Sequence, residues 1–293
     1  MGAPEKEPPD PDPATAASPA RSILLALALE DHFAHALRTG LAEAGWHVGL
    51  AHDAGTAVDF LGRRGAALII LDAELPDAQG ILRHVKLDAA LNPIPAIVLF
   101  PHGRSPLRPA ALRVQGDLEL TEPFDVGSLI AAAERRAARL AQGPPEPGLT
   151  ARFILPGRQA ELERVLQAIA GLLGTSGLDE AAQISFLAAA REAVGNAIQH
   201  GNRRDPAKSV RVEWRQTPEA VAIEVRDEGP GFDHAYHLGQ ARRKDAAEAA
   251  RDRRREGGQG GLGLLMLVRC TDRVDYNETG NAVTLTKLIP AAP

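Results

Sequence analysis

REAVGNAIQHG (191–201), VRDEGPGFD (225–233) and GGQGGLGLLMLV (257–268) are the three segments that decide the fold of the C-terminal half. In the first, Glu192 and Asn196 are four residues apart, so on a helix their side chains project from one face and can reach the same ligand. An amide oxygen suits a hard cation such as Mg²⁺, and a carboxylate can take a proton from a hydroxyl or a water. Taken alone, the pair is more typical of the polar stripe of an amphipathic helix.

The second segment places an acidic residue and two glycines at the end of a strand. VAIEV (221–225) predicts the strand, and DEGPGFD (227–233) places Asp227 at its end. Gly229 and Gly231 can take backbone angles that a Cβ would forbid, so a base can approach closely. A carboxylate here can accept a hydrogen bond from an exocyclic amino group, as on adenine. The alternative is an ordinary glycine turn that ends a hairpin.

The third segment is a glycine cluster ahead of the apolar run LLMLV (264–268). Free N–H groups and the dipole at a helix N-terminus favour anions, so the cluster predicts a loop that binds phosphate oxygens. Its spacing fits neither the Walker pattern nor a Rossmann fingerprint. The glycines concerned are Gly258, Gly260, Gly261 and Gly263.

In this order, the three segments resemble the GHKL nucleotide-binding fold, which histidine kinases, gyrase-type topoisomerases and the small anti-sigma-factor serine kinases share. Residues 150–290 carry the resemblance, and it is closest to the anti-sigma-factor serine kinases. The resemblance implies a two-layer α/β sandwich that binds ATP and Mg²⁺. It further implies that Asn196 holds Mg²⁺, Glu192 is the catalytic base and Asp227 binds adenine. The glycines that would shape the nucleotide loops are Gly229, Gly231, Gly261 and Gly263.

The preceding part of the chain, residues 21–141, alternates between apolar and amphipathic segments. Five strands alternating with five helices predict an α/β unit with a doubly wound, five-stranded parallel sheet. One of these helices, between IPAIVLF (94–100) and DLELT (117–121), has only a weak pattern. Ligands bind such sheets at the carboxyl ends of the strands, and Asp72 closes the apolar segment AALIILD (66–72).

LIILDAELPDAQG (68–80) resembles the phosphoacceptor segment of bacterial receiver domains, with Asp72 at the acceptor position. The remaining active-site positions depart from that pattern. The departures are Ala28 and Leu29 where two acidic residues hold Mg²⁺, Phe100 where a hydroxyl residue is expected, and Glu122 where a lysine is expected.

These departures remove the cations that phosphoryl transfer to a carboxylate requires. They favour a degenerate receiver that serves as a docking or dimerisation module. The alternative is a phosphorelay output protein phosphorylated on Asp72. Glu30 and Asp31 follow the expected acidic positions just out of register, and the alternative is favoured if they move to bind metal.

The remaining segments set the expected boundaries. Residues 1–20 are rich in Pro and Ala and predict a disordered tail, and residues 142–149 form a Pro/Gly linker ahead of an ATP-binding domain over 150–293. By the resemblance, the charged stretch between Phe232 and Gly257 is the ATP lid; a solvated helix is the alternative.

Composition and charge limit the classes of protein to which the chain can belong. The chain has 293 residues, a net charge of −5, one cysteine and no run of eighteen apolar residues. We expect no disulfide, no nucleic-acid partner and no membrane span, and a cytoplasmic location. Taken with the resemblance, these features predict a bacterial signalling protein that phosphorylates Ser or Thr of a protein partner, such as an anti-sigma-factor antagonist. The alternative is a non-catalytic, ATP-gated binding module that holds a sigma factor or another partner.

Overall fold

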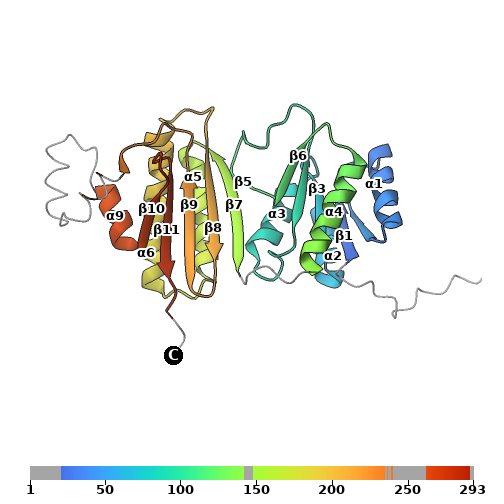
Figure 1. Ribbon diagram of the computed structural model, residues 1–293, viewed down its shortest axis with the longest axis horizontal. Coiled ribbons are helices and arrows are strands. Elements are labelled where there is room, and N and C mark those ends of the chain that lie inside the picture. Colours follow the sequence, from blue (N-terminus) through green and yellow to red (C-terminus); the bar gives the residue numbers. More distant parts are fainter. Residues whose placement is uncertain (1–20, 142–147, 235, 237–238, 240–261, 291–293) are drawn as a thin grey trace, which may run out of the picture.

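The computed structural model describes residues 21–141, 148–234, 236, 239 and 262–290. It contains two sheets that stand side by side along the long axis of the molecule (Figure 1). The first sheet has five strands in the order β2-β1-β3-β4-β6, and the second has six in the order β10-β11-β9-β8-β7-β5. Both parts are α/β, as the sequence predicts.

Every strand pairing in the first sheet is parallel. Alternate residues of its central strands face different cores, because successive side chains of a strand point to opposite faces. Leu24 and Ile69 share one core with α2 and α3, whereas Ile23 and Ile70 share the other with α1 and α4. The doubly wound sheet is therefore confirmed. Its elements are β1 (Ser22–Ala26), α1 (His32–Glu43), β2 (His47–Ala51), α2 (Ala54–Arg64), β3 (Leu68–Asp72), α3 (Ala78–Leu87), β4 (Ala96–Phe100), β6 (Leu118–Thr121) and α4 (Val126–Ala141).

The prediction of a fifth helix in this unit, between β4 and β6, is wrong. The segment consists of turns and irregular structure, and it contributes a short strand, β5 (Arg113–Val114), which pairs antiparallel with β7 (Leu149–Pro156) of the second sheet. Pro101, Pro106 and Pro109 explain the absence of a helix, since proline lacks the N–H that a helix interior needs and constrains the residue before it.

The second sheet has helices on one face, which confirms the two-layer sandwich. The pairings among its described strands are all antiparallel. The buried residues of β9 alternate with partly exposed ones, and the core below them includes Trp214, packed edge-on against Phe186 of α6 at 6.3 Å between ring centroids. The other elements are α5 (Gln159–Leu173), α6 (Glu180–Asn196), a π-helix (Ala197–Gly201), β8 (Ser209–Gln216), β9 (Ala220–Arg226), α9 (Leu262–Cys270), β10 (Arg273–Tyr276) and β11 (Ala282–Leu288).

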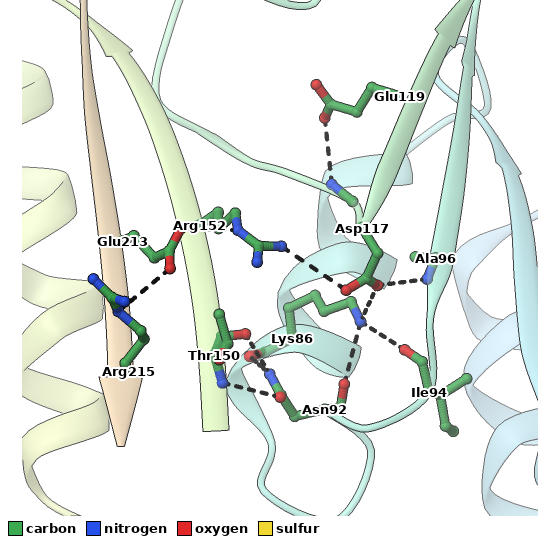
Figure 2. A network of polar contacts seen from close by, with 11 residues as sticks. Lys86, Asn92, Ile94, Ala96, Asp117, Glu119, Thr150, Arg152, Glu213 and Arg215 are labelled. Atoms are coloured by element: carbon green, nitrogen blue, oxygen red, sulfur yellow. Dashed lines mark hydrogen bonds and ion pairs between the residues drawn. The ribbon is translucent and has the colours of Figure 1, made fainter. Parts of the chain in front are cut away.

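The two units are joined by a polar network as well as by apolar packing of α3 against β5 and β7 (Figure 2). The Asn92 side chain bonds both the N–H and the C=O of Thr150, at 3.1 and 2.8 Å. The buried Lys86 ammonium pairs with Asp117 at 2.6 Å and donates to the carbonyls of Ile94 and Asn92. A buried charge of this kind is tolerated only when it is fully paired. Lys86 thereby orders Asn92 and Asp117, which contact Thr150 and Arg152 of the second unit.

Candidate functional site

Glu192 and Asn196 lie in the last turn of α6, and their side chains touch. The Asn196 amide nitrogen donates to Glu192 Oε1 at 3.0 Å. The chain then widens into the π-helix over Ala197–Gly201, a local irregularity that is frequent at functional sites. Because the amide nitrogen is turned to Glu192, the amide oxygen is the atom of Asn196 that suits a hard cation such as Mg²⁺.

Asp227 directly follows β9, as the sequence predicts, and is half-buried. Its backbone N–H donates to the Asn281 carbonyl at 3.0 Å, and its Oδ1 accepts from the Gly229 N–H at 2.7 Å. Burial raises the pKa of Asp227 above its ordinary value, and the Gly229 N–H acts in the opposite direction. The result is a partly desolvated carboxylate held in a defined orientation, which suits an acceptor for a ligand's amino group.

Glycines let three backbone segments meet around Asp227. A Cβ on Gly201 would lie 2.2 Å from Asp227 Cγ, and one on Gly229 would lie 2.3 Å from the Gly201 carbonyl oxygen. Gly231 has φ +78°, and its Cβ would lie 1.7 Å from the Thr279 carbonyl oxygen. The role of Gly201 is missing from the sequence-based prediction, although this glycine ends the first of the three segments; its contact with Asp227 is long-range.

The third segment reaches the same place through Gly263, in the first turn of α9. A Cβ on Gly263 would lie 2.0 Å from Glu192 Oε1, so this turn lies directly against the predicted catalytic base. Gly258, Gly260 and Gly261 lie outside the described residues, as do most residues of the predicted lid. The structure therefore brings together Glu192, Asn196 and Gly263, and the roles predicted for them remain predictions.

Tyr276, on β10, is a further residue of this site that the sequence does not reveal. The pKa of Tyr276 is raised to about 12, mainly by burial and to a smaller extent by the negative charges of Glu192 and Asp227. Both carboxylates therefore act on this one phenol, which stays neutral at physiological pH. Its ring packs edge-on against Phe232 and stacks on His234, each at 5.3 Å between centroids.

In the N-terminal unit, both carboxylate oxygens of Asp72 accept backbone N–H groups, from Glu74 at 2.8 Å and from Ala28 at 3.4 Å. The hydroxyl position of a receiver is filled by the buried Phe100, whose ring lies 4.9 Å from the Arg113 guanidinium. Glu122, at the lysine position, accepts from the His102 N–H at 2.9 Å.

The two acidic residues that follow β1 have partners of their own. Glu30 pairs with His52 at 3.0 Å, and Asp31 caps the N-terminus of α1 by accepting from the Ala34 N–H at 2.8 Å. Among the residues that the structure describes, no group of three or more His, Cys, Asp or Glu is arranged to hold a metal ion. Recruiting Glu30 and Asp31 to Asp72 would therefore require both to leave these contacts.

The C-terminal sheet and its helices match a known family. Residues 155–287 match the histidine kinase-like ATPase domain. The match makes this region similar to that family, and residues 155–287 are called the ATPase domain below. The ATPase domain contains Glu192, Asn196, Asp227 and Gly263, so the site described above lies within the matched region.

Solved structures similar to the chain include receiver domains, each covering only the N-terminal part. One is the receiver domain of a signal transduction histidine kinase from Syntrophus aciditrophicus, with 23% identity, 42% of this chain and 93% of that chain covered, and a TM-score of 0.36. Another is a response regulator receiver domain from Francisella, with 20% identity, 41% and 98% covered, and a TM-score of 0.35. The fold of this unit is defined by the strand order of the first sheet.

A comparison with curated proteins gives no match. Over the residues that the structure describes, no helix has both the length and the apolar character needed to cross a bilayer.

Proposed function

We propose that the chain binds Mg-ATP in the ATPase domain and transfers the γ-phosphoryl group to a serine or threonine of a protein partner, in a partner-switching circuit of the anti-sigma-factor type in the cytoplasm. The observation that carries the proposal is the convergence of three sequence segments on one place: Asn196 contacts Glu192, Gly263 lies against Glu192, and Gly201 of the first segment lies against Asp227 of the second.

The residues present fit both ligands. The backbone at Gly201 and Gly229 lies close to the Asp227 carboxylate, at positions where a Cβ would collide with it, and this carboxylate would accept from the adenine amino group. The Asn196 amide oxygen is a ligand of the kind that Mg²⁺ prefers. When bound, Mg²⁺ would offset the negative charge of the phosphates.

The chain's own residues would then orient the substrate and move one proton. Asp227 fixes the base, and the first turn of α9, whose Gly263 allows close approach, sets the phosphates near Glu192. Glu192 is positioned to take the proton of the attacking hydroxyl, and the Asn196 amide holds its carboxylate in place. Positioning and charge stabilisation would supply most of the rate.

In this proposal the N-terminal unit is a degenerate receiver that adjusts the activity of the ATPase domain or pairs two protomers. The aromatic side chain at the hydroxyl position, the hydrogen bond of Glu122 and the capping role of Asp31 support that assignment over a switch phosphorylated on Asp72.

The kinase proposal is tested by incubating the purified full chain with γ-labelled ATP, Mg²⁺ and candidate antagonist proteins. We expect phosphoserine or phosphothreonine on one partner, and its loss in Glu192→Gln. Tight ATP binding without a phosphorylated product, and with no effect of Glu192→Gln, would instead support an ATP-gated binding module.

A further inference from the structure

The segment between β4 and β5, residues 101–112, leaves the N-terminal unit and ends on the ATPase domain. At its start, the His102 N–H donates to Glu122 beside the carboxyl end of the parallel sheet. At its end, the Leu112 N–H donates to the buried carboxylate of Glu161 on α5, at 2.8 Å. The segment is thus attached to both units, and its middle part contacts the turn that carries Asp227.

That contact is a two-pronged ion pair between Arg108 and Glu228, the residue after Asp227. Arg108 Nη2 donates to Glu228 Oε2 at 2.8 Å, and Nη1 donates to the other carboxylate oxygen. A bidentate guanidinium–carboxylate pair fixes direction as well as distance. The pair raises the pKa of Arg108 and is the largest influence that lowers the pKa of Glu228. Both groups are therefore charged across the physiological range.

Glu228 is also tied to the ATPase domain itself. Its N–H donates to the side-chain oxygen of the buried Asn202 at 2.8 Å, and its Oε1 accepts from the Ser209 N–H at 3.0 Å. The Ser209 hydroxyl in turn donates to the carbonyl of Leu107 at 2.9 Å. Residues 107 and 108 therefore bind both the start of β8 and the turn after β9, two places that the Ser209–Glu228 hydrogen bond also joins directly.

We propose that Arg108 is a positioning residue for the nucleotide turn, residues 227–231, so that the N-terminal unit sets the geometry of the adenine pocket through the 101–112 segment. The inference rests on the proposed function, and it adds a route of regulation. Any event that shifts the 101–112 segment relative to the ATPase domain alters the orientation of Asp227, because Asp227 and Glu228 share one peptide unit.

The test compares full-length Arg108→Ala, Arg108→Lys, Glu228→Ala and the Arg108→Ala/Glu228→Ala double variant. Two quantities are measured: amide hydrogen exchange of the peptide covering 227–233 without nucleotide, and the Kd for ATP with Mg²⁺. We expect Arg108→Ala to speed exchange and to raise the Kd about fivefold. An effect of this size is typical for the loss of a partly exposed bidentate ion pair. Arg108→Lys should lie between, and the double variant should be no weaker than Glu228→Ala alone.

Arg63→Ala is the matched control, since Arg63 lies in the same unit and its ion pair with Asp59 contacts neither the segment nor the turn. It should leave both quantities unchanged. The inference is overturned if Arg108→Ala leaves exchange unchanged, or speeds exchange without changing the Kd, or adds its effect fully to that of Glu228→Ala. If the wild-type chain binds no ATP, the proposed function fails, whereas the exchange data still decide whether Arg108 fixes the turn.

Discussion

Replacing Gly201 with alanine should displace Asp227 and weaken ATP binding. The added Cβ would lie 2.2 Å from Asp227 Cγ, so this carbon must move by roughly 1 Å or more to reach ordinary contact distance. A shift of that size breaks the hydrogen bond predicted between the carboxylate and adenine, which is worth about 1.5–3 kcal/mol for a charged acceptor. The Kd for ATP should therefore rise roughly 10- to 150-fold.

Equilibrium dialysis with labelled ATP and Mg²⁺ measures this effect. Gly171→Ala is the control, because Gly171 is also helical and a Cβ there meets nothing within 4 Å. It should bind ATP like the wild type and gain about 0.5–1 kcal/mol of stability, as expected for alanine in place of a helical glycine. A folded Gly201→Ala protein that binds ATP as tightly as Gly171→Ala would refute the idea that the glycine is required by Asp227.

Three further predictions concern other parts of the molecule. The raised pKa of Asp227 means that the folded state binds this proton more tightly than the unfolded chain; the stability it adds is full below the unfolded value of about 4 and is lost as pH rises through the folded value. In a thermal shift assay, the Tm of Asp227→Asn should therefore exceed that of the wild type, and the excess should be larger at pH 7 than at pH 4. The variant should also lose affinity for ATP. An equal excess in Tm at both pH values would contradict this. Asn92→Ala removes a side chain that bonds Thr150 twice, and should lower the free energy of unfolding in urea by about 1–3 kcal/mol; an unchanged unfolding midpoint would show that the interface does not depend on it. Acetyl phosphate with Mg²⁺ should leave the chain unmodified, as judged by intact mass, whereas a phosphoryl adduct that disappears in Asp72→Asn would restore the receiver as a working switch.

The local features of this fold could be predicted from the sequence. The alternation of apolar and amphipathic segments was enough to predict the parallel sheet. The strand ahead of Asp227 and the helix that contains Glu192 and Asn196 also have clear patterns. These predictions depend on residues close together in the chain, where hydrophobic period and glycine position carry the information.

The features that were missed depend on contacts between distant residues. Strand β5 has two residues, Arg113 and Val114, and it forms only because β7 offers an edge some forty residues further on. Tyr276 joins the site because β10 lies at the edge of the sheet near α6 and the Asp227 turn, and nothing in its local sequence distinguishes it from any strand tyrosine. The ion pair of Arg108 with Glu228 joins residues 120 positions apart.

Calorimetric titration of the full chain with ATP in millimolar Mg²⁺ decides whether the ATPase domain binds nucleotide. We expect saturable heat corresponding to one nucleotide per chain, and its loss in Asp227→Ala, with the variant still folded. No heat from the wild-type chain, or the same heat from Asp227→Ala, would contradict this expectation.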